Sequence, residues 1–199
     1  MYLRPAFVET DLDRIEGLIR ANPFGVLVTH GPEGMNASHI PFAVERNGDE
    51  LIVIGHLATP NAQCAQFEGG EALAIFTGPH AYIAPSWYKT QPAVPTWDFS
   101  AVHIHGTLEP VFDHMEMLDQ LAAEDPGGFD VRDLPKKYQE MMFKGIRSFR
   151  LPAARIEAQW KMSQNRSIED RKGVIAGLRE QGLHEVAREI EATIPVAGE

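Results

Sequence analysis

The chain lacks several features that would narrow its function at once. It has a single cysteine, Cys64, so it forms no internal disulfide and shows no sign of a cysteine-held metal cluster. Its longest apolar runs are strand-sized, such as Phe24–Val28 and Leu51–Ile54, and its first residues do not join a basic to an apolar segment. We therefore expect no membrane span, no secretory signal and a cytoplasmic location.

Positive charge is also scarce. The chain has 18 Lys and Arg against 28 Asp and Glu, a formal net charge of −10. Affinity for nucleic acids depends largely on Lys and Arg that neutralise phosphates, so the charge argues against direct contact with DNA. The densest basic stretch, Arg166–Lys172, is diluted by Glu169 and Asp170 and is typical of a solvated helix face.

What is present is a strand-rich pattern in a chain of 199 residues, a length that predicts a single domain, residues 1–199, with C-terminal helices. Asn47-Gly48 is a strong hairpin signal. Six segments read as strands: Phe24–His30, Asn36–Glu45, Leu51–Gly55, Leu73–Thr77, Ala101–Val111 and Phe149–Met162, the last with an edge or bulge at Pro152. The pattern predicts a mainly β (α+β) fold, a six-stranded antiparallel Greek-key barrel decorated with helices.

Helices are expected around the barrel. Thr10 and Asp13 resemble a capping box for a first helix that ends at Asn22-Pro23, and Ser167 with Asp170 predicts another capping box for a helix ending at Gly182. The other expected helices are Asn61–Phe67, Asp113 to about Glu124, Tyr138–Ile146 with Met141, Met142 and Phe143 facing the core, and a short helix from Leu183.

Rare residues gather between Phe76 and Gly106. This stretch holds two of the three tryptophans, two of the four tyrosines and several prolines that hold the backbone in extended or turn geometry. Rings with polar edges suit a flat aromatic ligand that is stacked on one face and hydrogen-bonded at its rim. From composition alone, a loop whose rings cover one end of a barrel is an equal alternative.

The residues of this stretch also resemble a known family. The resemblance rests on Gly78–Ile83, Pro85–Tyr88 and Val94–Trp97, then on Met1-Tyr2 with Phe7, on Gly55-His56 with Ala58 and Asn61, and on Lys161–Arg166. In this order the segments are similar to those of PaiB-type proteins, a branch of the FMN-binding split barrels related to pyridoxamine 5'-phosphate oxidases. Asp98 departs from the pattern, because it places a negative charge where a neutral amide is usual.

The resemblance implies a split barrel that binds FMN in the groove of a homodimer, in a family described as negative transcriptional regulators. It implies flavin contacts from Ser38, His39, Ile40, His56, Ala58, Asn61, His80, Trp97, Lys161, Ser163, Gln164 and Asn165. Given the acidic charge, a regulator of this kind would act through a protein partner or a small-molecule effector.

Ile54–Asn61 reads as a strand that runs into a helix. Free amides and the positive end of that helix would make an anion cradle for the FMN phosphate. The alternative has Thr59 as N-cap and Pro60 as the first helical residue, with no ligand. The stretch lacks the Arg or Lys pair that the oxidases place there. Lys161–Arg166 has two similar interpretations: flavin contacts in the opposite subunit, or a strand-to-helix turn that serves stability.

Other chemistry finds little support. His103 and His105 share a strand face but lack a convincing third ligand, so we expect no metal. We see no nucleophile–base triad and no Gly-rich nucleotide motif. Two further functions stay open: a flavin-dependent oxidoreductase acting on a small substrate with the aromatic loop as lid, and a flavin or haem-related carrier.

Overall fold

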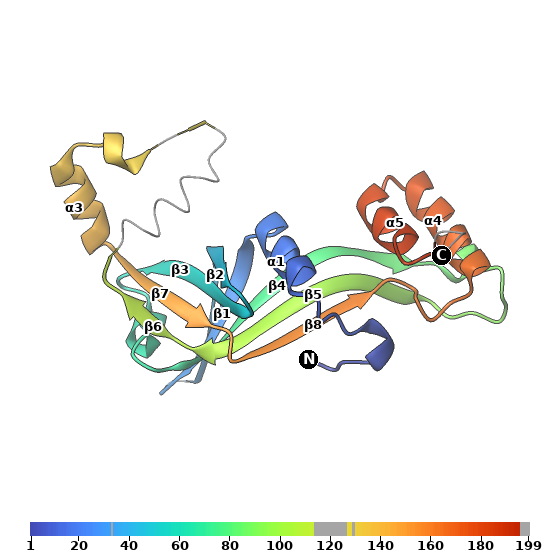
Figure 1. The fold of residues 1–199 in the computed structure, drawn as a ribbon, viewed down its shortest axis with the longest axis horizontal. Coiled ribbons are helices and arrows are strands. Elements are labelled where there is room, and N and C mark those ends of the chain that lie inside the picture. The colour runs from blue at the N-terminus through green and yellow to red at the C-terminus, as the bar shows by residue number, and fades with distance from the viewer. Residues whose placement is uncertain (33, 114–126, 129, 196–199) are drawn as a thin grey trace. The chain divides into compact units, whose positions relative to one another are not determined.

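The computed structural model describes residues 1–32, 34–113, 127–128 and 130–195. Its elements are η1 (Pro5–Phe7), α1 (Leu12–Ala21), β1 (Phe24–Gly31), β2 (Gly34–Asn47), β3 (Glu50–Ala58), η2 (Ala62–Gln66), β4 (Glu71–Ile83), η3 (Pro85–Trp87), β5 (Thr96–Thr107), β6 (Glu109–Val111), η4 (Val131–Asp133), α3 (Lys136–Lys144), β7 (Ile146–Pro152), β8 (Arg155–Lys161), α4 (Ile168–Glu180) and α5 (His184–Glu191) (Figure 1). The helix expected from Asp113 to Glu124 lies, after its first residue, outside the described residues.

The strands form one hydrogen-bonded sheet in the order β6-β7-β3-β2-β1-β4-β5-β8. The prediction of a mainly β, antiparallel fold with surrounding helices is confirmed, with eight strands in place of six. The Asn47-Gly48 hairpin is present, and Gly48 has the positive φ of 62° that the turn requires.

Two predicted strands each break in two, and the backbone shows why. Leu108, between β5 and β6, donates its N–H to Gly70 O and accepts from Gly69 N, so it leaves the ladder. After Pro152 the chain changes partner: Ala153 N still donates to Leu51 O of β3, and Ala154 N then donates to His105 O of β5. A proline has no N–H to continue the first ladder.

The chain divides into two compact units. The first comprises Met1–Asp11, Thr77–Val102 and Glu157–Glu199, and the second Leu12–Phe76 and His103–Ile156. The second unit is built on an aromatic core in which Phe42 contacts the rings of Phe76 and Phe149 edge-on, with centroids 5.1 and 6.2 Å apart. Edge-on packing is the favoured geometry for buried rings.

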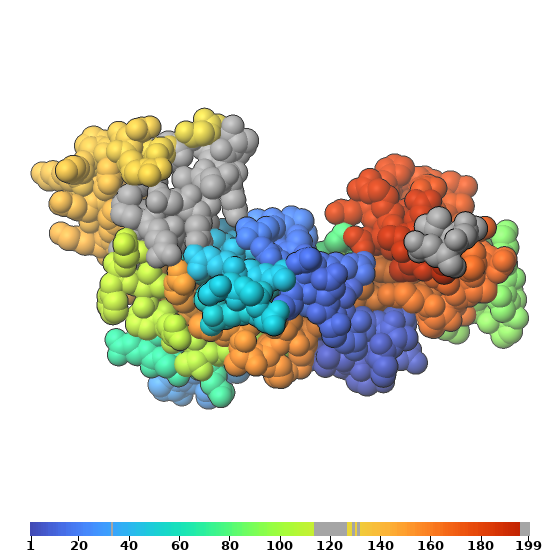
Figure 2. Space-filling model, viewed as in Figure 1, coloured from blue at the N-terminus to red at the C-terminus, as the bar shows by residue number. Residues whose placement is uncertain are grey.

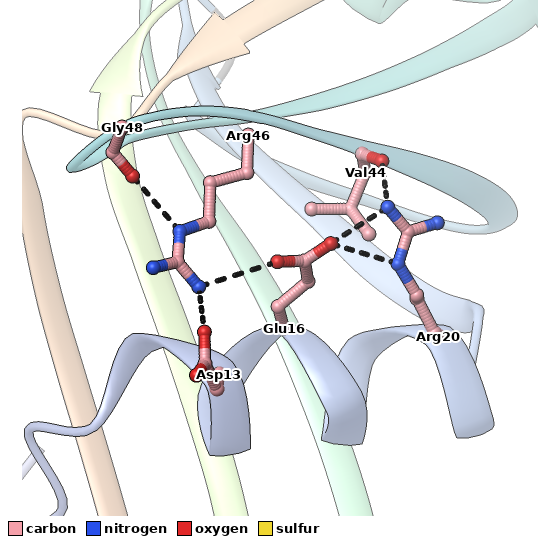
Figure 3. Close-up of polar contacts among 6 residues, drawn as sticks. All are labelled: Asp13, Glu16, Arg20, Val44, Arg46 and Gly48. Atoms are coloured by element: carbon pink, nitrogen blue, oxygen red, sulfur yellow. Dashed lines mark hydrogen bonds and ion pairs between the residues drawn. The ribbon is translucent and has the colours of Figure 1, made fainter.

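Helix α1 is tied to the β2–β3 hairpin by charges (Figure 3). Arg46 pairs with Asp13 and lies 3.5 Å from Glu16, which also binds Arg20 at 2.7 Å. Arg20 then donates to Val44 O at 3.0 Å. The apolar side of the helix is buried and consists of Ile15, Leu18 and Ile19. These core contacts hold the helix in place, and the ion pairs on its polar side add a smaller contribution to stability.

Helices α4 and α5 of the first unit pack against each other and form a continuous surface (orange to red in Figure 2). In the described part of the chain, no helix combines the length and the apolar character needed to cross a membrane.

Candidate functional site

The twelve residues predicted to contact flavin divide evenly between the two units. The second unit carries Ser38, His39, Ile40, His56, Ala58 and Asn61, and the first carries His80, Trp97, Lys161, Ser163, Gln164 and Asn165.

In the second unit, Ser38 and Asn61 meet in a polar network with a residue that the sequence did not single out, Gln63. Bonds to backbone groups determine which atoms of the two side-chain amides donate and which accept. Gln63 N donates to Asn61 Oδ1 at 2.9 Å, and Gln63 Nε2 donates to Leu27 O at 3.2 Å. Ser38 therefore donates to Gln63 Oε1 and accepts from Asn61 Nδ2 at 3.0 Å. Gln63 is 1% exposed, and its full set of partners explains how a buried amide is tolerated here.

The neighbours of Ser38 on β2 point in opposite directions. Ile40 is 7% exposed and belongs to the core, and it pairs with Gly25 of β1, so its side chain does not face a ligand at the surface. His39 lies on the exposed face and stacks on Phe24 of β1, with ring centroids 6.3 Å apart and an interplanar angle of 28°. Strands β1 and β2 thus present a phenyl ring and an imidazole side by side.

The predicted phosphate corner takes a form that neither interpretation of the sequence anticipated. Strand β3 ends at exposed Ala58, with half-buried His56 before it. The helix that follows is a five-residue 3-10 turn capped by Asn61, so Thr59 is not the N-cap. Thr59 instead bonds to the end of α3, donating its amide to Gly145 O at 2.9 Å and its hydroxyl to Lys144 O at 3.1 Å.

In the first unit, Lys161 and Ser163 converge on Asp98. Asp98 is fully buried and accepts from Ser163 Oγ at 2.5 Å and from Lys161 Nζ at 3.1 Å. Lys161 also donates to Thr96 Oγ1 at 2.6 Å and to Trp97 O. Burial raises the pKa of the Asp98 carboxyl, while the Ser163 hydrogen bond and the Lys161 charge act against that rise. The unusual acid in the motif is thus matched by a cation from β8.

The turn after Lys161 is built from its own side chains. Ser163 has a φ of 55°, which is uncommon outside glycine and is held here by its bond to Asp98. Gln164 accepts from Met162 N at 2.7 Å and donates to Trp160 O, so its amide serves the turn. Asn165 is exposed. Ser163 and Gln164 therefore stabilise the turn, whereas Asn165 is exposed to solvent.

His80 and Trp97 lie together on an exposed face of the first unit. Their ring centroids are 6.4 Å apart, and Tyr82 meets Trp97 edge-on at 6.1 Å. Trp97 is 56% and Tyr82 46% exposed. His80 is further oriented by a contact of 3.0 Å between Nδ1 and Gly78 O. Exposed rings of this size are suited to stacking on an aromatic ligand.

The rest of the aromatic loop is fastened to α4. Asp170 accepts from the amides of Lys89 and Thr90, both at 2.8 Å, and these bonds lower the pKa of its carboxyl. A Cβ on Gly177 would lie 2.4 Å from the Trp87 ring, which shows how closely that ring rests on the helix. Trp87, Lys89 and Thr90 thus pack on helix α4, a contact that neither interpretation of the loop predicted, whereas the rings of His80 and Trp97 remain exposed.

Comparisons with known proteins agree with this architecture. A family model described as "Putative FMN-binding domain" matches residues 1–155. The protein "Protease synthase and sporulation protein PAI 2" of Bacillus subtilis is 33% identical over 191 residues, which cover 91% of this chain and 90% of that protein.

Among solved structures, the flavocytochrome Anf3 from Azotobacter vinelandii aligns with a TM-score of 0.62 at 13% identity, covering 80% of this chain and 72% of that one. A FAD and heme binding protein from Mycobacterium smegmatis aligns with a TM-score of 0.55 at 18% identity, covering 77% and 73%. At these identities the likeness shows the fold, an antiparallel split barrel.

Proposed function

Because the chain belongs to the family of FMN-binding domains whose model covers residues 1–155, we propose that it is a homodimeric flavin-binding split barrel that acts as a negative regulator of transcription. The family match carries the proposal, and it bears out both the resemblance and FMN as the family's cofactor. The Bacillus subtilis relative, named for protease synthesis and sporulation, supports a regulatory role. The net charge of −10 favours action through a protein partner or a small effector over direct contact with DNA.

The described residues are chemically suited to a flavin. The second unit offers a polar network with fixed donors and acceptors around Ser38 and an exposed imidazole at His39. The first offers exposed rings at His80 and Trp97. Bound FMN would supply electron-transfer chemistry, and the chain's own part would be to stack on the ring, hydrogen-bond its polar edge and hold its phosphate.

An exposed apolar sheet face in the second unit supports the homodimer. On β1, Phe24 is 68% exposed and Val26 and Val28 are half-buried, and on β2 Met35 is 69% exposed. Leu73 pairs with Val28 and continues the face onto β4. Contiguous apolar faces of this kind are typical of interfaces, and a second copy would cover both faces at once.

The dimer is tested by Phe24→Glu, which places a charge on the exposed apolar face of the proposed interface. Light scattering at micromolar concentration should show a dimer for the parent chain and a monomer for the variant. Tyr138→Glu is the matched control, because Tyr138 is 47% exposed on α3 and lies outside the sheet face. A parent chain that is monomeric would remove the homodimer from the proposal.

A flavin-dependent oxidoreductase is the competing function, with the aromatic loop as a lid. A lid has to open, and the bonds from Asp170 to the loop and the contact of Trp87 with α4 hold this loop closed against its own unit. This geometry favours the regulator. The open rings of His80 and Trp97 are compatible with either function.

A visible spectrum of the protein purified from its host separates these functions from a haem-related carrier. Flavin bands are expected, and a Soret band without flavin would contradict the proposal. Gel shifts with promoter DNA, with and without FMN, should show no tight complex until a partner protein from the host is added. Turnover of an added electron donor by the flavin-loaded protein, without any effect on transcription, would favour the oxidoreductase.

A further inference from the structure

The backbone amides at the corner after β3 are already engaged. Four of them have acceptors within the chain: Thr59 N with Gly145 O at 2.9 Å, Asn61 N with Ala58 O at 2.8 Å, Gln63 N with Asn61 Oδ1 at 2.9 Å, and Cys64 N with Asn61 O at 3.0 Å. The amide cradle that the sequence suggested is therefore closed at these positions. An anion that binds here has to be neutralised by side chains.

A pocket of about 530 Å³ adjoins this corner, and Thr59 forms part of its wall. Its apolar lining includes Phe67, Val111, Phe143 and Ile146, from the end of η2, from β6, from α3 and from β7. Pockets of this volume, with an apolar lining and a few polar groups, are typical of small-molecule sites.

Two cations, Lys144 and Arg147, line the same pocket, and Glu140 is the one acid among its lining residues. Within the part of the chain that the structure describes, neither cation forms an ion pair. Other arginines of this unit do: Arg20 with Glu16, Arg46 with Asp13 and Arg150 with Glu45. Two cations against one acid in a pocket of an acidic protein favour the binding of an anion.

The register of the sheet brings these cations to the corner. Arg147 on β7 pairs with Leu57 on β3, and Lys144 ends α3, where its carbonyl accepts the Thr59 hydroxyl. The charge of Arg147 also reaches η2: burial raises the pKa of the Cys64 thiol, and Arg147 acts against that rise.

We propose that Lys144 and Arg147 form the cation pair that binds the phosphate of FMN. This inference rests on the proposed flavin-binding function and names the residues that read the phosphate. The sequence of the corner itself holds no Arg or Lys, and the fold supplies them from the neighbouring strand and helix. Arg offers a planar fork for two phosphate oxygens, and Lys adds a point charge.

The test compares FMN with riboflavin, which lacks the phosphate. Dissociation constants are measured by flavin fluorescence quenching for the parent, Arg147→Gln, Lys144→Gln and the double variant. Each single change should weaken FMN about tenfold, the usual effect of losing one charge-assisted hydrogen bond, and leave riboflavin within about twofold. The double variant should bind the two flavins alike. Lys137→Gln, on α3 but outside the pocket lining, is the matched control and should behave as the parent.

The outcomes separate this inference from the function on which it rests. If the double variant still prefers FMN, the inference is wrong and the flavin function stands. If riboflavin weakens as much as FMN and the melting temperature falls, Lys144 and Arg147 serve the fold, with Lys144 supporting the end of α3, and the inference is again wrong. If the parent chain binds neither flavin, the proposed function fails and this inference fails with it.

Discussion

Replacing Lys161 with Met removes the cation beside Asp98 while keeping the length of the side chain. The structure makes this a test of stability first and of ligand binding second. Asp98 is fully buried, and its partners are Lys161 and the Ser163 hydroxyl. After the change, Asp98 keeps the Ser163 hydrogen bond and the weaker influence of the Arg166 charge.

The magnitude follows from how deeply each partner is buried. Removing one member of a buried ion pair costs about 3 to 5 kcal/mol when the charge left behind stays buried. The Lys161 side chain is 19% exposed, so the pair is partly screened and we expect a loss of about 2 to 3 kcal/mol for Lys161→Met. Asp98→Asn should cost less, about 1 kcal/mol, because the freed ammonium keeps Thr96 Oγ1 and Trp97 O and reaches water.

The pH dependence gives a second readout. Burial raises the folded-state pKa of Asp98 above its unfolded value, so the favourable contribution of the protonated acid is complete below the unfolded pKa and is lost as pH rises through the folded pKa. Without Lys161 that folded pKa rises further. The deficit of Lys161→Met should therefore be larger at pH 8 than at pH 5, and it should nearly vanish when Asp98→Asn is also present.

Urea unfolding of the apoprotein at pH 5, 7 and 8 measures the parent, both single variants and the double variant. A coupling energy of at least about 1 kcal/mol at pH 7 is expected from the cycle. Additive losses, or a Lys161→Met protein as stable as the parent at every pH, would refute the reasoning. A loss of FMN affinity in this variant supports a direct contact between Lys161 and FMN only at a pH where the apoprotein remains folded.

Three further predictions concern the loop, its helix and α1. Gly177→Ala should destabilise by about 1 to 3 kcal/mol in thermal melts, because its Cβ would meet the Trp87 ring, whereas Gly17→Ala in α1, with nothing within 4 Å, should stabilise by up to about 1 kcal/mol; equal effects would contradict the packing. Asp170→Asn should lower the stability at pH 7 and weaken its dependence on pH in acid. The folded-state pKa of Asp170 is lowered, so its contribution to stability is present above the unfolded pKa and is lost as pH falls through the folded pKa. An unchanged pH dependence below pH 4 would contradict the proposed hydrogen bonds of Asp170 to the loop, called the clasp below. Glu16→Gln should cost less than about 1 kcal/mol, and a salt titration should shrink the loss, as expected for exposed ion pairs; a loss that salt leaves unchanged would be inconsistent with this.

Local patterns in the sequence predicted the elements well where short-range chemistry decides them. The Asn47-Gly48 turn and the N-cap at Ser167, whose hydroxyl accepts from Asp170 N at 3.1 Å, are of this kind. In the predicted capping box of Ser167 and Asp170, only the bond from Asp170 N to the Ser167 hydroxyl is confirmed. The Asp170 carboxylate bonds to the loop 80 residues away, and no pattern within the helix announces a partner so distant in sequence.

The misses share the same cause. Met141 and Met142 were expected in the core, but they are 60% and 39% exposed on α3, because an apolar stripe does not say whether another element will cover it. The sequence suggests the candidate flavin-binding residues as a set of motifs, but it does not predict the contacts between them. Gln63 stands next to no recognisable signal, and Lys144 and Arg147 reach the corner only through the pairing of β7 with β3.

The clasp between Asp170 and the aromatic loop also sets an order of events during synthesis. Asp170 follows Lys89 by 81 residues, so at about 5 to 20 residues per second the ribosome delivers the loop some 4 to 16 seconds before the carboxylate that fastens it. Until then Trp87 and its neighbours have no helix to rest on. Helix α4 lies beyond the family match but holds a loop that the match contains, so a chain cut at residue 155 would keep the sequence of the loop and lose the contacts that fix its conformation.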